Sequence, residues 1–536
     1  MIGIINFMAK EKIHILGICG TFMGGLAILG KESGLEISGC DSNIYPPMSE
    51  HLAEMGIDII SGYDPSDLPK ADFYVIGNAI SRGNPALEEL LNRKANLISG
   101  PQWLYNFILK DKKVIAASGT HGKTTTTAMI AWIFEYLKID VGYLIAGKPK
   151  DFKKSARKGS EDIFVIEADE YDTAFFDKRS KFIHYKPDTL IINNIEFDHA
   201  DIFKDIAAIH KEFHNLIRSM PEKAQIIFPT DDLNIAKVLN MGCWSKQESY
   251  SFRGKAQNNY TSVLPDYSEI RFKVGTDEGE LKWQMFGEYN ARNAMSAILA
   301  TSKYGITLKQ SLEALSNFRG VSKRQDILME SENIILMEDF AHHPTAIQMT
   351  LSGLRNKYKD HKIIAAIELR SNTMKSGHHD DLLIEATKEA DEVFWKSEDK
   401  TQVDKFLDSD VNRSRLIQSA EETSNEIIQA IETKTVIVVI SNADFDGLSQ
   451  KIIHKLKEKF FHSNNMEITL EINPGENSLE ELQSFREIGV NRASLGFQTL
   501  DSELLKLLTR THILDDCIAL YENTRDAGIE NISINL

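Results

Sequence analysis

With 536 residues the chain is too long for one hydrophobic core, so we expect three domains and a partial fourth unit. Hydrophobic residues make up 42% and charged residues 26%, which is typical of a water-soluble globular protein. The net charge of -17 argues against a nucleic-acid-binding surface spread over the whole molecule, so anionic ligands must be held locally.

Cysteine usage and hydropathy argue against disulfide-rich, zinc-binding, membrane-spanning and secreted proteins. The 4 cysteines include no CxxC pair, which argues against a disulfide framework or a zinc knuckle and fits a reducing compartment. No apolar run approaches the ~20 residues needed to cross a bilayer, and the N-terminus lacks a signal-peptide pattern. We therefore predict a cytoplasmic protein without a membrane partner, in which residues 1–7 form a short extension.

Short β-branched runs alternate with helical patterns along most of the chain, which predicts parallel sheets covered by helices. In the second unit a β-hairpin is expected, because apolar and charged residues alternate from Ile270 to Val274 and again from Leu281, around a turn at 276–279. The third unit ends with a helix at 448–459, before a polar linker at 462–465. Strands are expected at 12–18, 35–40 and 72–78 in a first unit that closes near 106–112, at 114–118, 163–168 and 189–195 in the second, at 333–337, 362–367, 392–395 and 435–440 in the third, and from 467 beyond the linker.

A glycine-rich loop follows the expected strand at 114–118. It reads Gly119-Thr120-His121-Gly122-Lys123-Thr124-Thr125 and leads into a helical pattern over 126–137. This order presents backbone N–H groups and a helix N-terminus to a phosphate, while Lys123 adds a positive charge and the Thr124 hydroxyl suits Mg²⁺. Ala117 stands where such loops usually have glycine, so the loop is a shorter variant. The alternative is a chance glycine turn before a helix.

Two polar residues follow buried strands of the same unit. Glu167 ends an apolar strand and His199 comes after another, so both are expected at the carboxyl edge of the sheet, where open α/β sheets bind ligands. A carboxylate, a hydroxyl and an imidazole around nucleotide phosphates would neutralise the charge that develops during phosphoryl transfer, with Mg²⁺ as the expected ion. Taken alone, either residue could instead be a capping acid or a satisfied loop histidine.

A second glycine turn, Gly17 to Gly25, joins the first strand to a helix, and Asp41 closes the next strand. The spacing of about twenty residues suits an acid that contacts a ribose. Cys19 replaces the second glycine of the dinucleotide pattern, so a nucleotide-sugar diphosphate is favoured over a dinucleotide. A tight turn without any ligand is equally compatible with these residues.

These motifs resemble the Mur ligase family over about residues 12 to 458. The general pattern lies in the loop at 119–125, in Glu167 and His199, in Asn290 and Asn293, in Arg324, and in Asp339-Phe340-Ala341-His342-His343-Pro344. The branch of the family that recycles cell-wall peptides is indicated by residues 20–25, 100–104, 171–172, 175–181 and 370–375.

The resemblance implies a three-domain α/β architecture and an ATP-dependent ligase. A Rossmann-like domain at 1–112 would bind a UDP-sugar, a central P-loop domain at 113–324 would bind ATP, and a Rossmann-like domain at 325–460 would bind a peptide. The enzyme would join UDP-N-acetylmuramate to L-Ala-γ-D-Glu-meso-diaminopimelate through an acyl phosphate, as a monomer, in peptidoglycan recycling. Two alternatives stay open: a UDP-N-acetylmuramate–L-alanine ligase, or a catalytically impaired nucleotide-binding relative.

The resemblance also implies a role for each motif residue. Lys123, Glu167 and His199 would be catalytic, with Thr124 and Glu167 on one Mg²⁺ and His199 on a second. Asn290 and Asn293 could instead be surface polar residues, and His342 to Pro344 could merely shape a loop. ATP would contact Gly119, Thr120, His121, Gly122, Lys123, Thr124, Thr125, Asn290, Asn293, Arg324 and Asp339; the UDP-sugar would contact Gly17, Gly20, Thr21, Phe22, Met23, Gly24, Asp41, Asn78, Ala79 and Arg82; and the peptide would contact Arg370, Ser371 and Asn372.

Two positions depart from the family pattern. Where a glycine-rich turn is expected, this chain has Ser441-Asn442-Ala443-Asp444-Phe445-Asp446-Gly447. The lost glycines would hinder positive φ angles and add two carboxylates beside a substrate cleft. Leu369 replaces a proline, which we regard as a minor change.

Residues 466–536 resemble a middle piece of radical-SAM proteins related to coproporphyrinogen dehydrogenase, through residues 467–475 and 489–498. Those proteins hold an iron–sulfur cluster with three cysteines in CxxxCxxC, whereas this segment contains only Cys517. We therefore expect no iron–sulfur cluster, no radical chemistry and an incomplete barrel with unpaired sheet edges. A gene fusion or a reading-frame accident explains this segment better than a bifunctional enzyme.

Overall fold

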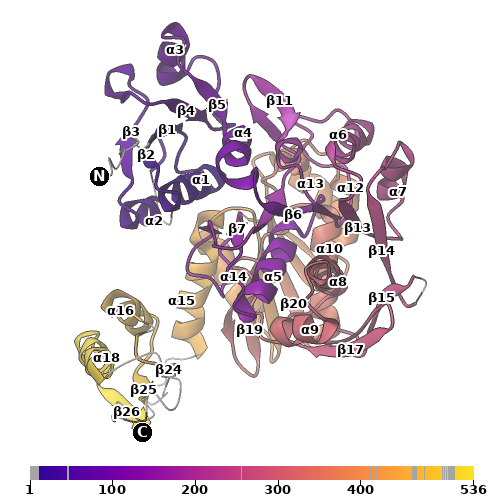
Figure 1. Cartoon of the computed structure of the whole chain (residues 1–536). Coiled ribbons are helices and arrows are strands. Elements are labelled where there is room, and N and C mark those ends of the chain that lie inside the picture. Colours follow the sequence, from indigo (N-terminus) through magenta and orange to yellow (C-terminus); the bar gives the residue numbers. More distant parts are fainter. Residues whose placement is uncertain are drawn as a thin grey trace. The chain divides into compact units, whose positions relative to one another are not determined.

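The computed structural model divides into two units, Met1–Leu416 with Glu432–Ala443, and Ile417–Ile431 with Asp444–Leu536. Figure 1 labels the elements of both units. The predicted extension at 1–7, the linker at 462–465 and the start of a strand at 467 lie outside the described residues. The structure describes residues 11–44, 48–254, 256–410, 413–417, 419–460, 468–475, 477–497, 499, 501, 504 and 514–535.

The first sheet of the larger unit is parallel and has the strand order β3-β2-β1-β4-β5. The order reverses between β1 and β4, and such a switch point opens a crevice at the carboxyl ends of the strands. The Gly17 turn follows β1 and Asn78 follows β4, so both flank this crevice. The elements are β1 (Lys12–Leu16), β2 (Glu36–Asp41), β3 (Asp58–Ser61), β4 (Phe73–Ile76), β5 (Leu97–Ser99), α1 (Thr21–Glu32), α2 (Met48–Glu54), α3 (Pro85–Asn92) and α4 (Gly100–Leu104).

The central sheet has ten strands in the order β17-β16-β15-β14-β13-β12-β6-β9-β7-β8. It is parallel from β15 to β7 and antiparallel at both edges. Apolar side chains on both faces of β6, β9 and β12 are buried, as expected for inner parallel strands. The elements are β6 (Lys113–Ser118), β7 (Gly142–Leu144), β8 (Ala156–Arg157), β9 (Ile163–Ala168), β12 (Thr189–Ile192), β13 (Gln225–Pro229), β14 (Lys246–Phe252), β15 (Asn258–Ser262), β16 (Glu269–Val274), β17 (Asp277–Lys282), α5 (Lys123–Tyr136), α6 (Ile206–Ser219), α7 (Leu233–Asn240), α8 (Glu288–Ser302) and α9 (Leu308–Ser316).

The predicted β-hairpin forms from β16 and β17, but the predicted position of its turn is wrong. Val274 pairs with Asp277, so the turn consists of Gly275 and Thr276, and residues 277–279 belong to β17. Gly275 has a φ of +61°, which a two-residue hairpin turn requires at its first central position. The charged residues Asp277 and Glu278, which suggested a turn, are instead exposed residues of an edge strand.

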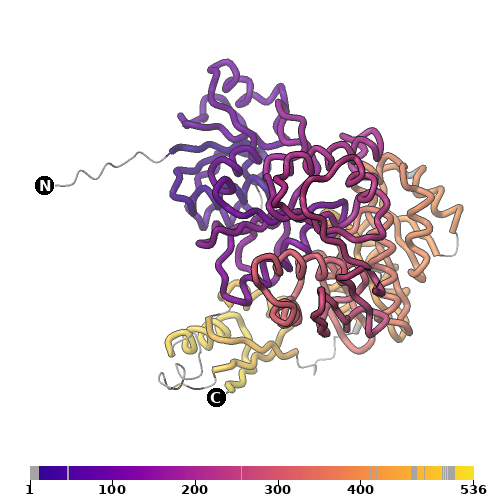
Figure 2. Tube along the Cα trace, turned by 45° about the vertical axis from the view of Figure 1, so that its right-hand side comes forward, coloured from indigo at the N-terminus to yellow at the C-terminus, as the bar shows by residue number. Residues whose placement is uncertain are grey.

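The third sheet has the order β18-β19-β23-β20-β21-β22 and is parallel except for the β18–β19 pair. A short separate hairpin, β10 with β11, follows β9. The chain runs through the three sheets of the larger unit in sequence order, from indigo through magenta to orange (Figure 2). The elements are β10 (Asp172–Ala174), β11 (Asp177–Ser180), β18 (Asp326–Glu330), β19 (Ile334–Asp339), β20 (Lys362–Glu368), β21 (Glu392–Lys396), β22 (Ser414–Leu416), β23 (Thr435–Ile440), α10 (Pro344–Lys357), α11 (Asn372–Lys375), α12 (Asp380–Ala386) and α13 (Lys400–Ser409).

The described part of the smaller unit includes the helices α14 (Ala420–Ala430) and α15 (Leu448–Phe460) and a three-stranded parallel sheet. The sheet is β24 (Thr469–Ile472), β25 (Arg492–Gly496) and β26 (Asn531–Asn535), accompanied by α16 (Leu479–Glu487) and α18 (Leu514–Asp526). It is an open sheet in the described part of the chain, as expected for an incomplete barrel. Cys517 is buried in the apolar core of this sheet. Among the described residues, no helix combines the length and the apolar composition needed to cross a membrane.

Candidate functional site

The glycine loop at 119–125 connects β6 to α5 and wraps the N-terminus of that helix. Gly119 and Gly122 have φ angles of +125° and +82°, which favour glycine. A Cβ atom at Gly122 would lie 2.5 Å from Asn293 Oδ1, so the position also needs glycine for close packing. The loop therefore directs backbone N–H groups of the α5 N-terminus into the adjoining cavity of about 720 Å³.

Residues of the glycine loop, of α8 and of the junction with the third sheet line this cavity. The predicted ATP-site residues in its lining are Thr120, His121, Gly122, Lys123, Thr124, Thr125, Asn290, Asn293, Arg324 and Asp339, joined by Glu167 and His199, and by Phe22 from the predicted UDP-sugar set. Gly119 is not among the lining residues. The structure thus places Lys123, Glu167 and His199, which are far apart in sequence, around one cavity.

Lys123 is held by two carboxylates that the sequence analysis did not assign. Its Nζ lies 2.9 Å from Glu170 Oε2 and 3.9 Å from Asp169 Oδ1, and it donates to the Gly119 carbonyl at 2.9 Å. Burial lowers the pKa of the Lys123 ammonium, but the charges of Glu170 and Asp169 outweigh that effect, and the pKa is raised. Lys123 therefore keeps its positive charge, and a phosphate must compete with Glu170 for it.

Glu167 lies at the end of β9 beside the first turn of α5. Its Oε1 accepts a hydrogen bond from the Ala146 N–H at 2.9 Å, and Arg324 approaches the neighbouring Thr124 hydroxyl at 3.5 Å. Burial raises the pKa of the Glu167 carboxyl, although the Ala146 N–H, Arg324 and Thr124 oppose the rise. A carboxylate and a hydroxyl oxygen on adjacent elements are donors that fit Mg²⁺.

His199 belongs to a separate group of possible metal ligands. Its Nε2 lies 3.2 Å from Glu170 Oε1, and ligand atoms of Asp169, Glu170 and His199 lie within 4.8 Å of one another. Burial lowers the pKa of the His199 imidazole, but the hydrogen bond and charge of Glu170 outweigh it, so the pKa is raised. Two carboxylates and an imidazole are a plausible ligand set for a second divalent ion once the imidazole is neutral.

Asn290 and Asn293 lie on α8 and are buried, so the alternative of surface polar residues is wrong. Asn293 Oδ1 accepts from the Thr126 hydroxyl at 3.1 Å, while its Nδ2 is a buried donor that lacks a partner in the described structure. Asn290 Nδ2 donates to Phe286 O and Gln325 Oε1. An unsatisfied donor facing a cavity suits a polar ligand such as a nucleotide.

Arg324 and Asp339 reach the cavity from the junction with the third sheet. The Arg324 guanidinium lies 4.4 Å from the centre of the Phe340 ring, and Asp339 accepts backbone N–H groups of Gln325 and Ala341, each at 2.9 Å. His343 caps α10 by accepting the Thr345 N–H at 3.3 Å, so it has a structural role in this loop.

Family models account for most of the chain. Residues 12–112 match "Mur ligase family, catalytic domain", residues 117–301 match "Mur ligase middle domain", and residues 323–443 match "Mur ligase, glutamate ligase domain". A ligase of Escherichia coli K12, named UDP-N-acetylmuramate–L-alanyl-γ-D-glutamyl-meso-2,6-diaminoheptandioate ligase, is 45% identical over 453 residues, covering 84% of this chain and 99% of the relative. The chain belongs to the Mur ligase family.

Solved structures agree with this assignment. A murein peptide ligase from Psychrobacter arcticus is 37% identical, with a TM-score of 0.66 over 86% of this chain and 100% of that one. A ligase of the same type from Neisseria is 43% identical, with a TM-score of 0.55 over 58% of this chain and 99% of its own. The Thermotoga maritima UDP-N-acetylmuramate–alanine ligase, at 22% identity and a TM-score of 0.69, shares the fold. The predicted three-domain architecture is confirmed.

The C-terminal part of this Mur ligase matches a second family. Residues 408–536 match the "Radical SAM superfamily", which overlaps the glutamate ligase domain match over 408–443. Within the overlap, β22 and β23 pair with strands of the third sheet of the Mur ligase. The finer resemblance to coproporphyrinogen dehydrogenase stays a prediction, as does the absence of an iron–sulfur cluster.

The N-terminal glycine turn of the Mur ligase joins β1 to α1, as predicted. Gly17 has a φ of +79°, and Gly20 is the N-cap of α1. Asp41 Oδ2 accepts the Cys19 N–H at 3.0 Å, so this acid braces the turn. Arg82 is exposed and paired with Glu88 at 2.9 Å. Thr21, Asn78 and Ala79 are exposed around the turn, while Met23 and Gly24 are buried and Phe22 is half-buried.

The predicted peptide residues lie at the start of α11, where Arg370 and Ser371 precede the helix and Asn372 is its first residue. Arg370 and Asn372 are exposed, and Arg370 Nη1 lies 3.8 Å from Glu368 Oε1. Ser371 is the N-cap of α11, and its hydroxyl also donates to the His342 carbonyl at 3.3 Å. Arg370 and Asn372 are therefore accessible to a ligand, whereas Ser371 also has a structural role.

The turn that lost its glycines still adopts positive φ angles. Phe445 and Asp446 each have a φ of +53°, and Gly447 has +69°. Non-glycine residues therefore adopt the left-handed region at two positions of this turn, contrary to the expectation that the lost glycines would prevent it. Phe445 is buried, which offsets part of the strain, and Asp446 is exposed.

Several functional candidates were missed from the sequence. Asp169 and Glu170 follow Glu167 after one alanine, so three acids in four residues at a strand end were an available signal. Lys181, whose Nζ lies 2.9 Å from Asp169 Oδ2 and which lines the same cavity, directly follows the β10–β11 hairpin and was given no role from the sequence. Its position depends on the tertiary fold.

Proposed function

We propose that this Mur ligase joins the muramoyl carboxylate of UDP-N-acetylmuramate to the free amine of L-Ala-γ-D-Glu-meso-diaminopimelate, with hydrolysis of ATP to ADP and phosphate. The observation that carries the proposal is the convergence of Lys123, Glu167 and His199 on one cavity. The relatives from Escherichia coli and Haemophilus influenzae, whose names state this reaction, are 45% and 43% identical and are covered over 99% and 100% of their lengths.

The reaction has two transfers. The muramoyl carboxylate attacks the γ-phosphate of ATP, which releases ADP and forms an acyl phosphate. The peptide amine then attacks the acyl carbon, forms the amide bond, loses a proton and releases phosphate. Backbone N–H groups at the start of α5 and the Lys123 ammonium would bind the phosphates and stabilise the transferring charge.

The metal-binding residues support the same steps. Thr124 and Glu167 would hold one Mg²⁺, and His199 with Asp169 and Glu170 would hold a second. When bound, these ions would supply positive charge against the phosphate oxygens. Glu170 would then exchange its contact with Lys123 for a contact with metal, which frees the ammonium for a phosphate. Enclosure of the site between the central and third sheets would limit hydrolysis of the acyl phosphate.

We further propose how the chain divides this work. Residues 1–112 would bind the UDP-sugar at the Gly17 turn, 113–324 would bind ATP, and 325–460 would present Arg370 and Asn372 to the peptide. Residues 466–536 would carry no iron–sulfur cluster, since Cys517 is their only cysteine and is buried in an apolar core. The enzyme would act as a monomer in the cytoplasm, where nucleotides and UDP-sugars are made.

Comparison of two acceptors tests the proposed function. Purified protein with ATP, Mg²⁺ and UDP-N-acetylmuramate should release phosphate at least about tenfold faster with the tripeptide than with L-alanine. A preference for L-alanine would identify an L-alanine ligase instead. ATP binding without phosphate release, with either acceptor, would identify a catalytically impaired relative.

A further inference from the structure

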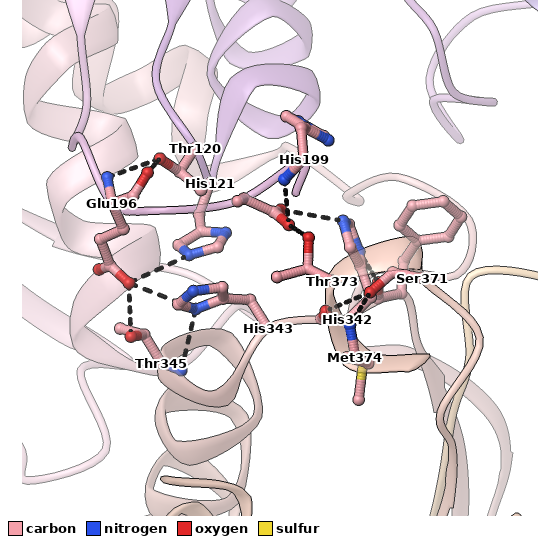
Figure 3. A network of polar contacts seen from close by, with 12 residues as sticks. Thr120, His121, Glu196, His199, His342, His343, Thr345, Ser371, Thr373 and Met374 are labelled. Carbon is pink, nitrogen blue, oxygen red and sulfur yellow. Dashed lines mark hydrogen bonds and ion pairs between the residues drawn. The ribbon is translucent and has the colours of Figure 1, made fainter. Parts of the chain in front are cut away.

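The short segment at 196–200, which carries His199, follows β12 and is bound from two sides (Figure 3). On one side, the Thr120 hydroxyl of the glycine loop accepts the Glu196 N–H at 2.8 Å. The His121 ring lies on the same side, with Nε2 at 3.6 Å from Glu196 Oε2. The first residue of the segment is thus tied to the loop that is proposed to bind phosphate.

On the other side, loops of the third sheet contact the same segment. The Thr345 hydroxyl donates to Glu196 Oε2 at 2.6 Å, next to His343 (Figure 3). The rings of His343 and His379 each place Nε2 at 3.3 Å from the Phe197 carbonyl oxygen. The segment is therefore held by two parts of the chain that are more than a hundred residues apart.

Thr373 makes the contact that flanks His199 most closely. Its hydroxyl donates to Asp198 Oδ1 at 2.7 Å and accepts the Ala200 N–H at 3.2 Å, so one oxygen bridges the residues before and after His199. The His199 N–H itself donates to Asp198 Oδ1 at 2.8 Å. Thr373 and Asp198 are buried, with exposed fractions of 1% and 2%, which strengthens a charge-assisted hydrogen bond.

The backbone of His199 explains why such a bridge is needed. Its φ is +58°, a conformation that costs a residue with a side chain about 1–2 kcal/mol. Such strain persists where neighbouring contacts over-determine the backbone. The Thr373 hydroxyl spans this residue, and the resulting conformation directs the imidazole toward Glu170 at 3.2 Å.

Thr373 also lies next to the predicted peptide loop. It is the second residue of α11, directly after Asn372, and α11 is capped by Ser371. A peptide bound at Arg370 and Asn372 would therefore act on the helical turn that carries the Thr373 hydroxyl. Because Asp198 and Ala200 flank His199, a displacement of that turn would change the position of the imidazole.

We propose that Thr373 is a positioning residue that couples the acceptor-peptide loop to the metal-binding imidazole of His199. The inference rests on the proposed ligase function and extends it, because it names the contact through which acceptor binding reaches the phosphoryl-transfer site. Thr373 touches neither ATP nor metal in this scheme. It acts through Asp198 and the Ala200 N–H.

Two variants at one position test the proposal. Thr373→Val keeps the shape but removes the hydroxyl, and should lower kcat about 10- to 100-fold and raise the Mg²⁺ concentration for half-maximal rate by a similar factor. The KM for ATP should stay within about twofold, because the glycine loop is unchanged. Thr373→Ser keeps the hydroxyl and should retain kcat within about threefold. A purely structural role would lower Tm in both variants without changing the Mg²⁺ dependence.

The partner residue provides a second check. Asp198→Asn should lower kcat, and the double variant should be no slower than the slower single variant, since both changes break one interaction. A normal kcat and Mg²⁺ dependence in Thr373→Val would overturn the proposal, and so would a loss of kcat in Thr373→Ser as large as that in Thr373→Val. In either case, turnover by the wild type would still support the ligase function.

If the wild type releases no phosphate, the ligase function fails, and Mn²⁺ binding still tests the positioning role. Electron paramagnetic resonance would compare Mn²⁺ bound in the presence of a non-hydrolysable ATP analogue. Thr373→Val should weaken one Mn²⁺ site about tenfold relative to wild type and Thr373→Ser. Identical Mn²⁺ binding in all three proteins would overturn the inference.

Discussion

At the scale of single residues, the site combines buried charges that balance one another. Glu170 contacts both Lys123 and His199, so one carboxylate bridges the ammonium and the imidazole. Burial raises the pKa of the Glu167 carboxyl, although the Ala146 N–H, Arg324 and Thr124 oppose the rise. A buried carboxylate beside a hydroxyl is a favourable place for a divalent ion.

Replacing Glu167 by glutamine tests this assignment. Glutamine keeps the size but removes the negative charge, so phosphate release should fall by about 100-fold at saturating substrates. Glu248→Gln is the matched control, because Glu248 is a half-buried carboxyl on β14 of the same sheet, hydrogen-bonded to Asn258 and Gln225. Near-normal turnover of Glu167→Gln, measured by steady-state phosphate release, would contradict a metal-binding role.

A pH effect is expected at His14, a fully buried residue of β1. Burial lowers the pKa of the His14 imidazole from 6.5 to about 4, so the unfolded chain binds a proton more readily than the folded one. The contribution of the neutral His14 imidazole to the free energy of unfolding is fully present above pH 6.5. It is lost as the pH falls toward 4, by up to about 1.4 kcal/mol per pH unit.

The variant His14→Gln should therefore show a shallower fall in the free energy of unfolding between pH 6.5 and 4. Urea unfolding at several pH values measures the effect. Parallel curves for the variant and the wild type would mean that His14 does not titrate differently in the folded and unfolded states.

At the scale of elements, the loops at strand ends carry the function. The glycine loop forms because β6 ends in buried residues, and Gly119 and Gly122 then let the chain turn sharply into α5. The tight approach of Gly122 to Asn293 ties this loop to α8. At Gly122, the positive φ angle and the close approach to Asn293 are therefore two separate reasons for glycine.

Two glycine-to-alanine variants separate these requirements. In Gly122→Ala the new Cβ would stand on a backbone with positive φ and would lie 2.5 Å from Asn293 Oδ1. This variant should therefore abolish measurable ATP binding in calorimetry. Gly305→Ala, at a φ of +84° with no atom within 4 Å, should cost about 1 kcal/mol of stability but bind ATP normally. Equal ATP affinity in the two variants would show that the close packing at Gly122 is dispensable.

The turn at 445–447 offers a stabilising change. Asp446 is exposed at a φ of +53°, where glycine is less strained, so Asp446→Gly should raise the free energy of unfolding by about 0.5 kcal/mol. Asp444→Gly is the control, because Asp444 has helical angles of −83° and −18° and glycine should destabilise it. Thermal unfolding of both variants measures the difference, and a lower Tm for Asp446→Gly would show that its side-chain contacts outweigh the strain.

At the scale of the whole molecule, the C-terminal sheet has its own buried cluster. That cluster draws on residues from Ile468 to Ile532, including Leu482, Leu495 and Leu520. The predicted catalytic and substrate-binding residues all lie between Gly17 and Asn372. The segment that matches the radical SAM family therefore includes a hydrophobic core distinct from the cores of the ligase sheets.

Truncation after residue 460 tests whether residues 461–536 take part in the ligase reaction. The shortened chain should keep kcat/KM for the tripeptide within about twofold, because it retains every residue proposed for catalysis and binding. The full-length protein should contain less than one iron atom per chain when purified without oxygen. Loss of ligase activity in a folded truncated protein, seen by circular dichroism, would assign residues 461–536 a role in the reaction.

Buried parallel strands were predictable from the sequence, and exposed strands were not. The strands β6, β9 and β23 are continuous apolar runs whose predicted and observed bounds agree closely, whereas β12 begins as predicted at Thr189 but ends at Ile192, three residues early. The edge strand β17 reads Asp-Glu-Gly-Glu-Leu-Lys, and its one buried residue could not outweigh the turn-like composition. Edge strands have half their surface in water, so their composition overlaps with that of loops.

The sequence by itself determined that a phosphate-binding loop, a carboxylate and an imidazole stand at the carboxyl ends of parallel strands, because strand, turn and helix signals are local. Only the tertiary structure decided that Glu170 joins Lys123 to His199, and that Thr373 reaches across 175 residues of sequence to Asp198. The contacts of Glu170 arise between loops that follow neighbouring strands of the central sheet, and the contact of Thr373 arises where the central and third sheets meet. Their energies depend on distance and burial, which residue order along the chain does not specify.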